Sequence, residues 1–341
     1  MLTFATYFDS GFLDRGVTCL TSLLERCSEP VALHVLALDD ECASALPRAL
    51  PPAANLTVVT MAEFEARHPE LVAVRPRRSR IEYYFTLTPL LCADALAVTA
   101  PDQLMVYLDA DMFCFSDPAP ALAGIGGADV FVTEHRFAPH HVHLAKLYGR
   151  FNVGFLGFRN NAAGRACLAR WAGQCLDWCG IEPEEGRFGD QKYLDAWPRE
   201  VRRLAVLAHA GINAGPWNVG RHCYQATPSG VTLDGEPLVI FHFHRLRVLG
   251  PWHYETDFRD YGSLPRVLRE DVYLPYLSAL EATRERLGIP PPRADARAAP
   301  APGHSLLRAM ASRLAATARL FTRRRVVFAG GRVLSPIQAL L

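Results

Sequence analysis

Apolar runs of strand length alternate with amphipathic segments of helix length in the first part of the chain. The strand–helix pairs lie at residues 2–7 and 16–26, 32–38 and 41–50, and 56–60 and 62–68. In the helical segments the apolar residues recur on one face, as in helices that cover a core. Strands that alternate with helices in this way are typical of βαβ units. The pattern therefore predicts an α/β fold with an open, mainly parallel sheet flanked by helices.

The alternation continues to residue 287, where the composition changes. Further helices are predicted over 81–98, 139–148, 162–179 and 265–287, and further strands over 129–133, 151–158 and 238–244. Residues 290–303 are rich in proline and alanine, as extended linkers are. We therefore divide the chain into one α/β domain at 1–289, a linker at 290–303 and a C-terminal tail at 304–341.

One apolar run, which begins at Gln103, ends in Asp109-Ala110-Asp111. Such a run is typical of a buried strand, and side chains two residues apart on a strand share a face. Both carboxylates are therefore expected at the strand's carboxyl end, where open α/β sheets bind ligands. Two oxygen ligands there suit Mg²⁺ or Mn²⁺, which in turn holds the oxygens of a diphosphate. A loop with two solvated carboxylates is the alternative.

Composition places the chain among globular proteins. Hydrophobic residues make up 50% and charged residues 21%, and no run of 18 or more apolar residues indicates a transmembrane helix. The N-terminus lacks the basic start and the cleavage site of a signal peptide. The nine cysteines are expected as buried thiols in a reducing compartment. We therefore expect a cytoplasmic protein.

Positive charge is concentrated in the tail. Residues 292–341 carry nine arginines and one acid, Asp295, which is a charge of +8. The whole chain has a net charge of +1, so residues 1–291 carry −7. Over 304–325 a predicted helix places its apolar residues on one side and its arginines elsewhere, and such helices bind anionic membranes. We expect peripheral attachment to the inner face of a membrane; a helix packed on the domain, or disorder, is the alternative.

Four further motifs place small or polar residues at predicted strand ends or in loops. They are T-Y-F-D at 6–9, F-N-V-G-F-L-G-F at 151–158, G-D-Q at 189–191 and H-F-H at 242–244. His242 and His244 share a face of the last predicted strand, although each is also explained as a hydrogen-bonded core histidine. Asp190 precedes a predicted helix, so its alternative role is that of a helix N-cap.

With these motifs in this order, and a basic loop before an aromatic helix at 81–98, the chain resembles the GT-A fold glycosyltransferases. It is especially similar to the family 8 type and its bacterial relatives, which build lipopolysaccharide and related glycans. The resemblance covers residues 1–285. It implies a GT-A (Rossmann-like), mixed, mainly parallel sheet. It also implies transfer of a sugar from a UDP-sugar to a glycan or lipid-linked acceptor, with Mn²⁺ or Mg²⁺ as cofactor. No nucleic-acid partner is expected.

The resemblance also assigns roles to residues. Asp109, Asp111 and His242 are implied as metal ligands, with His244 as the alternative histidine, and Asp190 is implied beside the reacting sugar. Contacts to the nucleotide sugar are implied for Thr6, Tyr7, Asp9, Arg80, Tyr84, Asp109, Ala110, Asn152, Gly154 and Gln191. Core packing, a solvated surface charge and local backbone hydrogen bonding are the respective alternatives for Tyr7, Arg80 and Asn152.

The chain departs from the family pattern at the diphosphate. The family's histidine is usually followed by a small residue and Lys-Pro-Trp, whereas this chain has Arg245 and Arg247 after H-F-H, and either arginine is available to replace the lysine. The resemblance favours retention of the anomeric configuration. Inversion requires a carboxylate base, for which Asp190 and Glu134 are candidates.

Two other classes of function remain as alternatives. A nucleotidyltransferase that makes sugar nucleotides normally has a glycine-rich phosphate loop after its first strand. Here that place reads Y-F-D-S-G-F at 7–12, with one glycine, which argues against this class. A non-catalytic carbohydrate-binding protein is the second alternative, and the intact D-A-D and G-D-Q motifs argue against it.

Overall fold

A seven-stranded sheet forms the centre of the molecule. The computed structural model describes residues 1–184, 186–250, 253–256, 258, 261, 264–290, 325–329 and 332–334. The strands of the sheet are β1 (Leu2–Phe8), β2 (Val31–Ala37), β3 (Asn55–Thr60), β4 (Leu104–Leu108), β6 (Val130–Glu134), β7 (Phe151–Arg159) and β8 (Leu204–Val206). Their order is β3-β2-β1-β4-β7-β6-β8. The first four are mutually parallel, and only β7 is antiparallel to its neighbours. The predicted mixed, mainly parallel sheet is confirmed.

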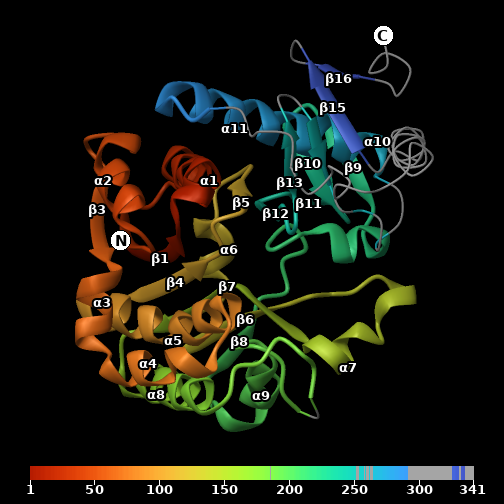
Figure 1. Cartoon of the computed structure of the whole chain (residues 1–341). Helices are drawn as coiled ribbons and strands as arrows, with labels where there is room; N and C mark the ends of the chain where they lie inside the picture. The colour runs from red at the N-terminus through yellow and green to blue at the C-terminus, as the bar shows by residue number, and fades with distance from the viewer. Residues whose placement is uncertain are drawn as a thin grey trace, which may run out of the picture.

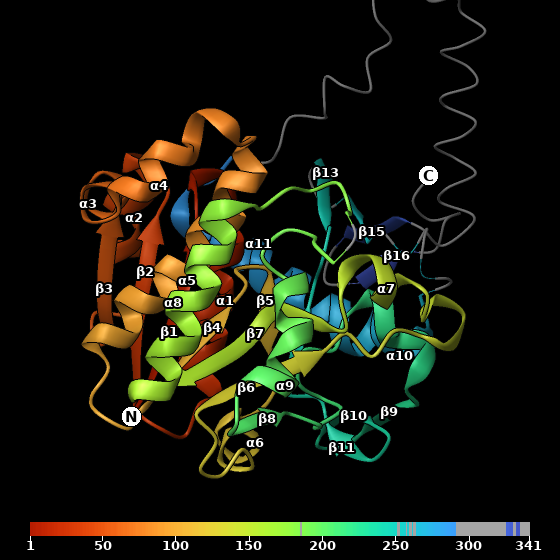
Figure 2. The same cartoon turned by 90° about the horizontal axis from the view of Figure 1, so that it is seen from below.

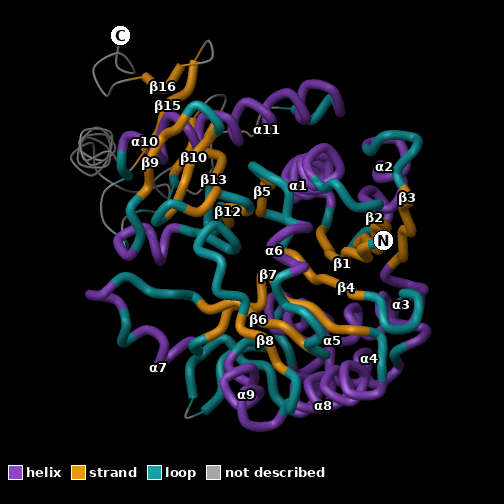
Figure 3. Tube along the Cα trace, turned by 180° about the vertical axis from the view of Figure 1, so that it is seen from behind, coloured by secondary structure: helices purple, strands orange, loops and turns teal. Residues whose placement is uncertain are grey.

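Helices cover both faces of this sheet (Figures 1 and 2). One face carries α3 (Met61–Arg67), α4 (Pro69–Val74), α5 (Arg80–Val98), α8 (Ala162–Asp177) and α9 (Trp197–Glu200), and the other carries α1 (Leu13–Arg26), α2 (Asp40–Ala49) and α6 (Ala119–Ala123). The strand period of two divides the side chains between the faces: Ala5 and Met105 join the core under α5, whereas Phe4 and Val106 join the core under α1. Figure 3 shows the helices on both sides of the strands.

The long helix α5 lies in the first of these cores. It begins at a capping box formed by Ser79 and Glu82, and it continues without interruption through Pro89. By length and composition it is apolar enough to cross a membrane, but 56% of its apolar window is buried inside the protein. A buried core helix accounts for this composition.

A smaller lobe with its own core is formed by β5 and by the elements that come after the sheet in the chain. Its elements are β5 (Met112–Cys114), β9 (Tyr224–Thr227), β10 (Gly230–Leu233), β11 (Glu236–Pro237), β12 (Ile240–His242), β13 (Arg247–Gly250), β14 (His253–Glu255), α10 (Arg266–Leu268) and α11 (Leu274–Leu287). A π-helical turn at Arg269–Tyr273 joins the two helices, in line with the predicted helix or helix pair. The strand predicted over 238–244 is shorter, because only β12 pairs with β5.

The connection between β6 and β7 projects from the main body beneath this lobe (Figure 1). The single helix predicted over 139–148 is replaced by a 3₁₀ turn at Pro139–His141 and a short helix, α7 (Leu144–Tyr148). Histidine is a poor helix former, and the segment contains three. The helix ends at Gly149, whose φ of +104° suits glycine. We refer to residues 139–149 as the β6–β7 arm.

The end of the chain returns to the lobe. β15 (Arg325–Ala329) pairs with β14, and β16 (Arg332–Leu334) pairs with β15, both antiparallel. These strands were not predicted. The basic helix predicted over 304–325 lies outside the described residues, apart from Arg325, which begins β15 and is therefore not helical. The proposed division at 289 and 303 stays a prediction.

Gly157 in β7 provides a test of this packing. A Cβ atom there would lie 2.3 Å from Cε1 of Phe131 and 2.7 Å from the carbonyl oxygen of Met105. Gly157→Ala is expected to lower the free energy of unfolding by about 1–3 kcal/mol, because ring and backbone must move. The control is Gly173→Ala in α8, where no atom lies within 4 Å. It should raise stability by about 0.5–1 kcal/mol. Urea unfolding measures both variants. If Gly157→Ala and Gly173→Ala change the free energy of unfolding equally, the close packing around Gly157 is contradicted.

Candidate active site at the carboxyl end of β4

Two short strands bring the D-A-D and H-F-H motifs together. The chain turns through D-A-D directly after β4 and enters β5, which pairs antiparallel with β12. In this ladder Met112 lies opposite His242. The backbone N–H of Phe243 donates to the carbonyl oxygen of Asp111 at 2.8 Å. Motifs that are 130 residues apart in the sequence therefore become neighbours through backbone pairing.

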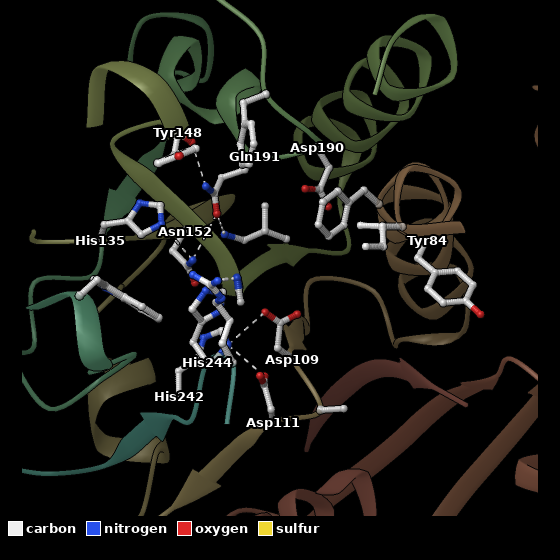
Figure 4. A pocket seen from close by; sticks show the side chains of 18 of the residues that line it. Tyr84, Asp109, Asp111, His135, Tyr148, Asn152, Asp190, Gln191, His242 and His244 are labelled. Atoms are coloured by element: carbon white, nitrogen blue, oxygen red, sulfur yellow. Dashed lines mark hydrogen bonds and ion pairs between the residues drawn. The ribbon is translucent and has the colours of Figure 1, made fainter. Parts of the chain in front are cut away.

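The imidazole of His242 contacts both carboxylates of the D-A-D motif (Figure 4). Its Nε2 atom lies 2.9 Å from Oδ1 of Asp111 and 3.7 Å from Oδ2 of Asp109. His244 joins the same group, since one ligand atom from each of Asp111, His242 and His244 lies within 4.8 Å of the others. The structure thus brings together all four residues that the sequence analysis named as candidate ligands.

Burial and mutual charge set the protonation of this group. Burial alone would raise the pKa of Asp111. The charge and the hydrogen bond of His242 outweigh burial and lower this pKa to about 2. Burial would lower the pKa of His242, and the charge of Asp111 raises it instead. Burial and the charge of His242 lower the pKa of His244 to about 4. Without a metal the imidazolium of His242 offsets the carboxylates; a bound cation would release that proton, because a ligating imidazole is neutral.

Gly154 on β7 leaves room for the side chains of Asn152, Asp109 and His242 to lie close together. A Cβ atom at Gly154 would lie 2.7 Å from Oδ1 of Asn152, 2.8 Å from Oδ2 of Asp109 and 2.9 Å from Nδ1 of His242. The space that a side chain would occupy is therefore filled by three polar groups of the site. The predicted importance of small residues in this strand has a physical reason here.

Tyr107 holds Asp109 from the buried side. Its hydroxyl donates to Oδ1 of Asp109 at 2.8 Å, and its ring is almost fully buried. Oδ2 is left to face His242. The sequence analysis did not single out Tyr107, although it precedes Asp109 by two residues on the same strand face, which is a usable signal.

Asn152 lines the cavity, but its amide is engaged within the protein. Nδ2 donates to Nε2 of His135 and to Oε1 of Gln191, each at 3.2 Å. Oδ1 accepts from the backbone N–H of Gly154 and from Nδ2 of Asn213, each at 2.9 Å. All hydrogen-bonding positions of an asparagine amide are then used. The geometry favours a role in which Asn152 holds its neighbours in place over direct contact with a sugar.

His135 and Asn213 are members of this network that the sequence analysis missed. Burial lowers the pKa of His135 to about 3, so its ring is neutral, and Nδ1 lies 3.1 Å from the carbonyl oxygen of Gly149. The tautomer therefore donates from Nδ1 and accepts at Nε2. His135 directly follows the buried strand β6, and a polar residue in that position is the signal that would have identified it.

Aromatic and charged side chains lie at the end of β1 and the start of α5. Arg80 forms an ion pair with Asp9, and its Nε donates to the hydroxyl of Tyr84 at 2.9 Å. The rings of Tyr7 and Tyr84 are 6.2 Å apart. Thr6 does not line the cavity: strand alternation turns its side chain away from that of Tyr7, and its hydroxyl is buried. The expected contact of Thr6 with the nucleotide stays a prediction, and it would have to be made by the backbone of Thr6.

Asp190 lies in the cavity wall and is 5% exposed. Burial, followed by the charge of Asp109, raises the pKa of its carboxyl to about 7. The following 3₁₀ turn, Lys192–Ala196, has Gln191 at its N-cap position and no side-chain cap. The alternative role of Asp190 as a helix cap is therefore wrong. The indole N–H of Trp171 donates to its backbone carbonyl at 2.8 Å, which fixes the loop.

The site forms one cavity of about 1240 Å³. Of the predicted site residues, its lining contains Tyr7, Asp9, Arg80, Tyr84, Asp109, Ala110, Asp111, Asn152, Gly154, Asp190, Gln191, His242 and His244. This volume exceeds the roughly 300–1,000 Å³ of a typical small-molecule pocket, so it has room for two substrates. Arg245 lines the cavity, whereas Arg247 pairs with Glu255 outside it. Glu134 pairs with Arg150 and is likewise outside the lining.

The ligand atoms fit a divalent transition metal. Carboxylate oxygens together with imidazole nitrogens suit Mn²⁺ better than Mg²⁺, which prefers oxygen ligands alone. Nδ1 of His242 is a buried polar atom with no hydrogen-bond partner among the described residues. Asp111, His242 and His244 would hold the ion, with Asp109 beside them.

Comparison with known proteins gives uncharacterised relatives and glycosyltransferase structures. No family model matches the chain. The uncharacterized protein YfnD of Bacillus subtilis (strain 168) is 27% identical over 286 residues, which cover 82% of this chain and 88% of YfnD. The uncharacterized protein YfnF of the same strain is 28% identical over 253 residues, which cover 72% of this chain and 82% of YfnF.

Among solved structures, the chain is similar to the galactosyltransferase LgtC, with 14% identity, a TM-score of 0.47 and coverage of 79% of this chain and 100% of LgtC. It is also similar to mouse xyloside xylosyltransferase 1, with 14% identity, a TM-score of 0.46 and coverage of 72% and 98%. Because both TM-scores lie below 0.5, we infer the activity from the side chains of the site.

The buried carboxyl of Asp190 leads to a prediction about stability. Its pKa is about 7 in the folded protein, against an ordinary value of 3.8. Ionisation therefore opposes folding, and the wild type should lose stability relative to Asp190→Asn as the pH rises from 5 to 7. The loss is at most about 1.4 kcal/mol per pH unit. Urea unfolding of the metal-free protein at both pH values measures it, with Asp177→Asn at the exposed end of α8 as the control. If the free energies of unfolding of Asp190→Asn and the wild type differ by the same amount at both pH values, the raised pKa of Asp190 is contradicted.

Proposed function

We propose that this protein is a metal-dependent glycosyltransferase that moves a sugar from a nucleoside-diphosphate sugar to an acceptor hydroxyl. The observation that carries the proposal is the convergence of Asp109, Asp111, His242 and His244 at the end of β4, in a cavity that also holds Asp190. Cation ligands and a buried carboxylate in one large cavity are what the cleavage of a sugar–diphosphate bond requires.

The donor in this proposal is a UDP-sugar. The rings of Tyr7 and Tyr84 offer flat surfaces for a base, and Asp9 lines the same cavity. Arg245 lines the cavity, and in this proposal it takes the place of the missing lysine at the diphosphate. A guanidinium suits this task because it binds phosphate oxygens bidentately.

The chemistry follows from where charge develops. A divalent cation, when bound, supplies Lewis-acid stabilisation of the leaving diphosphate. Asp190 is placed to hold sugar hydroxyls or to stabilise positive charge at the anomeric carbon. In this proposal the acceptor hydroxyl is the nucleophile, and its proton passes to the leaving diphosphate if configuration is retained. For inversion, Asp190 remains as a base, because Glu134 lies outside the lining.

Two alternatives fit the site less well. A nucleotidyltransferase would need a phosphate loop after β1, but β1 leads through a 3₁₀ turn at Ser10–Phe12 directly into α1. A non-catalytic carbohydrate-binding protein has no need for two carboxylates held against two imidazoles. Clustered, mutually perturbed titratable groups in a cavity are typical of catalytic sites.

The cellular setting extends the proposal. We infer a role in the synthesis of bacterial surface polysaccharide on the cytoplasmic side, with a glycan or lipid-linked acceptor. This inference is supported by the sequence resemblance and by the basic composition of the tail. The tail helix that would contact the membrane surface lies outside the described residues.

The metal is the first test of the proposal. Asp111→Ala should reduce Mn²⁺-dependent hydrolysis of a UDP-sugar by about 10²-fold or more, since Lewis-acid stabilisation contributes several kcal/mol. His242→Ala should weaken the binding of Mn²⁺ more than His244→Ala does, because Nε2 of His242 contacts both carboxylates. A panel of UDP-sugars with and without Mn²⁺ provides the measurement. Near-normal turnover of Asp111→Ala would refute the metal site, and a dominant effect at His244 would reverse the choice of histidine.

The membrane proposal needs a test that keeps the lobe intact, because truncation of the tail would also remove β15 and β16. We expect the full chain to sediment with vesicles containing phosphatidylglycerol, and to do so less after four tail arginines are changed to Gln. These are Arg308, Arg313, Arg319 and Arg323. Each contributes about 1 kcal/mol near an anionic surface.

The matched control changes four exposed arginines of the main domain to Gln. These are Arg26, Arg77, Arg199 and Arg202. The control variant should sediment like the wild type. If both variants lose binding equally, the tail is not the anchor.

A further inference from the structure

The cavity has two halves with different side-chain chemistry. Every carboxylate among the described lining residues belongs to the half formed by β1, the D-A-D turn and the G-D-Q loop. These are Asp9, Asp109, Asp111 and Asp190. The other half is lined by the β6–β7 arm, which contributes His140, His141 and His143. In Figure 4, Tyr84 lies on one side of the D-A-D group, whereas His135 and Tyr148, near the two ends of the arm, lie on the other.

Nitrogen donors cluster on the arm. The ring centroids of His140 and His141 are 4.1 Å apart, and those of His141 and His143 are 6.3 Å apart. His140 and His143 are exposed to the cavity solvent. Imidazole N–H groups donate to an anion in either protonation state and attract it further when charged. Several donors around one space match the several acceptor oxygens of a phosphate group.

The arm is connected to the rest of the site through Trp217. The backbone N–H of Ala138, which directly precedes the arm, donates to the carbonyl oxygen of Trp217 at 3.1 Å. The indole of Trp217 lies edge-on to the ring of His244, with centroids 5.7 Å apart. The arm therefore lies on the side of the cavity that is formed by Trp217 and His244.

The arm is also fixed to the loop that carries Asp190. Nε2 of Gln191 donates to the carbonyl oxygen of Tyr148 at 2.8 Å. The rings of Tyr148 and Phe188 are in edge contact, with centroids 4.8 Å apart. A molecule held by the arm would consequently lie next to Asp190, opposite the place where the D-A-D group would hold a donor.

We propose that the β6–β7 arm binds the acceptor and that this acceptor carries a phosphate group, recognised by His140 and His143. The inference rests on the proposed transferase function and specifies its acceptor. Val142 and Leu147 on the arm are exposed apolar side chains, with 57% and 43% of their surface accessible. They offer contact to a hydrocarbon attached to the phosphate, as in a lipid-linked acceptor, whereas a soluble sugar phosphate would use the nitrogen donors alone.

The test uses the full chain saturated with UDP and Mn²⁺, so that the donor half is occupied. Calorimetric titration compares hexyl phosphate with hexanol, and glucose 1-phosphate with methyl glucoside. At least one phosphate probe should bind tenfold or more tightly than its neutral partner. The double variant His140→Ala/His143→Ala should lose this preference and keep its affinity for UDP. Lys146→Ala is the matched control, because Lys146 is an exposed cation of the arm that does not line the cavity.

The outcomes separate the two sources of phosphate. Tighter binding of hexyl phosphate supports a lipid-linked acceptor, and tighter binding of glucose 1-phosphate supports a soluble one. Equal binding of charged and neutral probes, or an equal loss in Lys146→Ala, would overturn the inference. Failure of the proposed function would appear separately, as an absence of Mn²⁺-dependent UDP-sugar hydrolysis in a protein that still binds the phosphate probe.

Discussion

Two carboxylates at the end of one buried strand impose the constraint on which the rest of the site depends. Asp109 and Asp111 repel each other, and neither is stable as a charge in a buried site without a counter-charge. His242 supplies that charge from a distant part of the chain, at 2.9 Å from Asp111. Gly154 leaves room for the contact, and Tyr107 fixes which oxygen of Asp109 faces inward. A divalent cation would satisfy the same constraint more fully than one imidazolium.

The core of the C-terminal lobe keeps His242 in place. In the H-F-H motif the histidine faces the site, whereas Phe241 and Phe243 on either side are fully buried in the lobe. Phe243 stacks on Tyr276 of α11, with ring centroids 3.7 Å apart. The alternation of a strand thus converts hydrophobic burial into the orientation of a polar ligand. The closing helix contributes to the site through this packing although it supplies no ligand among the described residues.

Local sequence patterns were sufficient to predict the sheet, the D-A-D turn and the paired histidines. Each of these features depends on a period of two or 3.6 residues. A motif that is read as a unit does not reveal that the side chain of Thr6 faces away from the cavity, because neighbouring strand residues face opposite sides. Asn213 gave no signal, since its backbone φ of +53° and its bond to Asn152 depend on tertiary packing. The broken helix of the β6–β7 arm shows the same limit, because apolar spacing alone does not reveal weak helix propensity.

The central claim is that Asp109, Asp111 and the imidazoles of H-F-H hold a cation that also binds a nucleoside diphosphate. Pulsed electron paramagnetic resonance of Mn²⁺ bound to the full chain with UDP tests it directly. The account predicts hyperfine coupling to imidazole ¹⁴N and to ³¹P in the same spectrum, with the ¹⁴N coupling reduced in His242→Ala. Coupling to ³¹P without any ¹⁴N coupling, or no stoichiometric binding of Mn²⁺ in the presence of UDP, would contradict it.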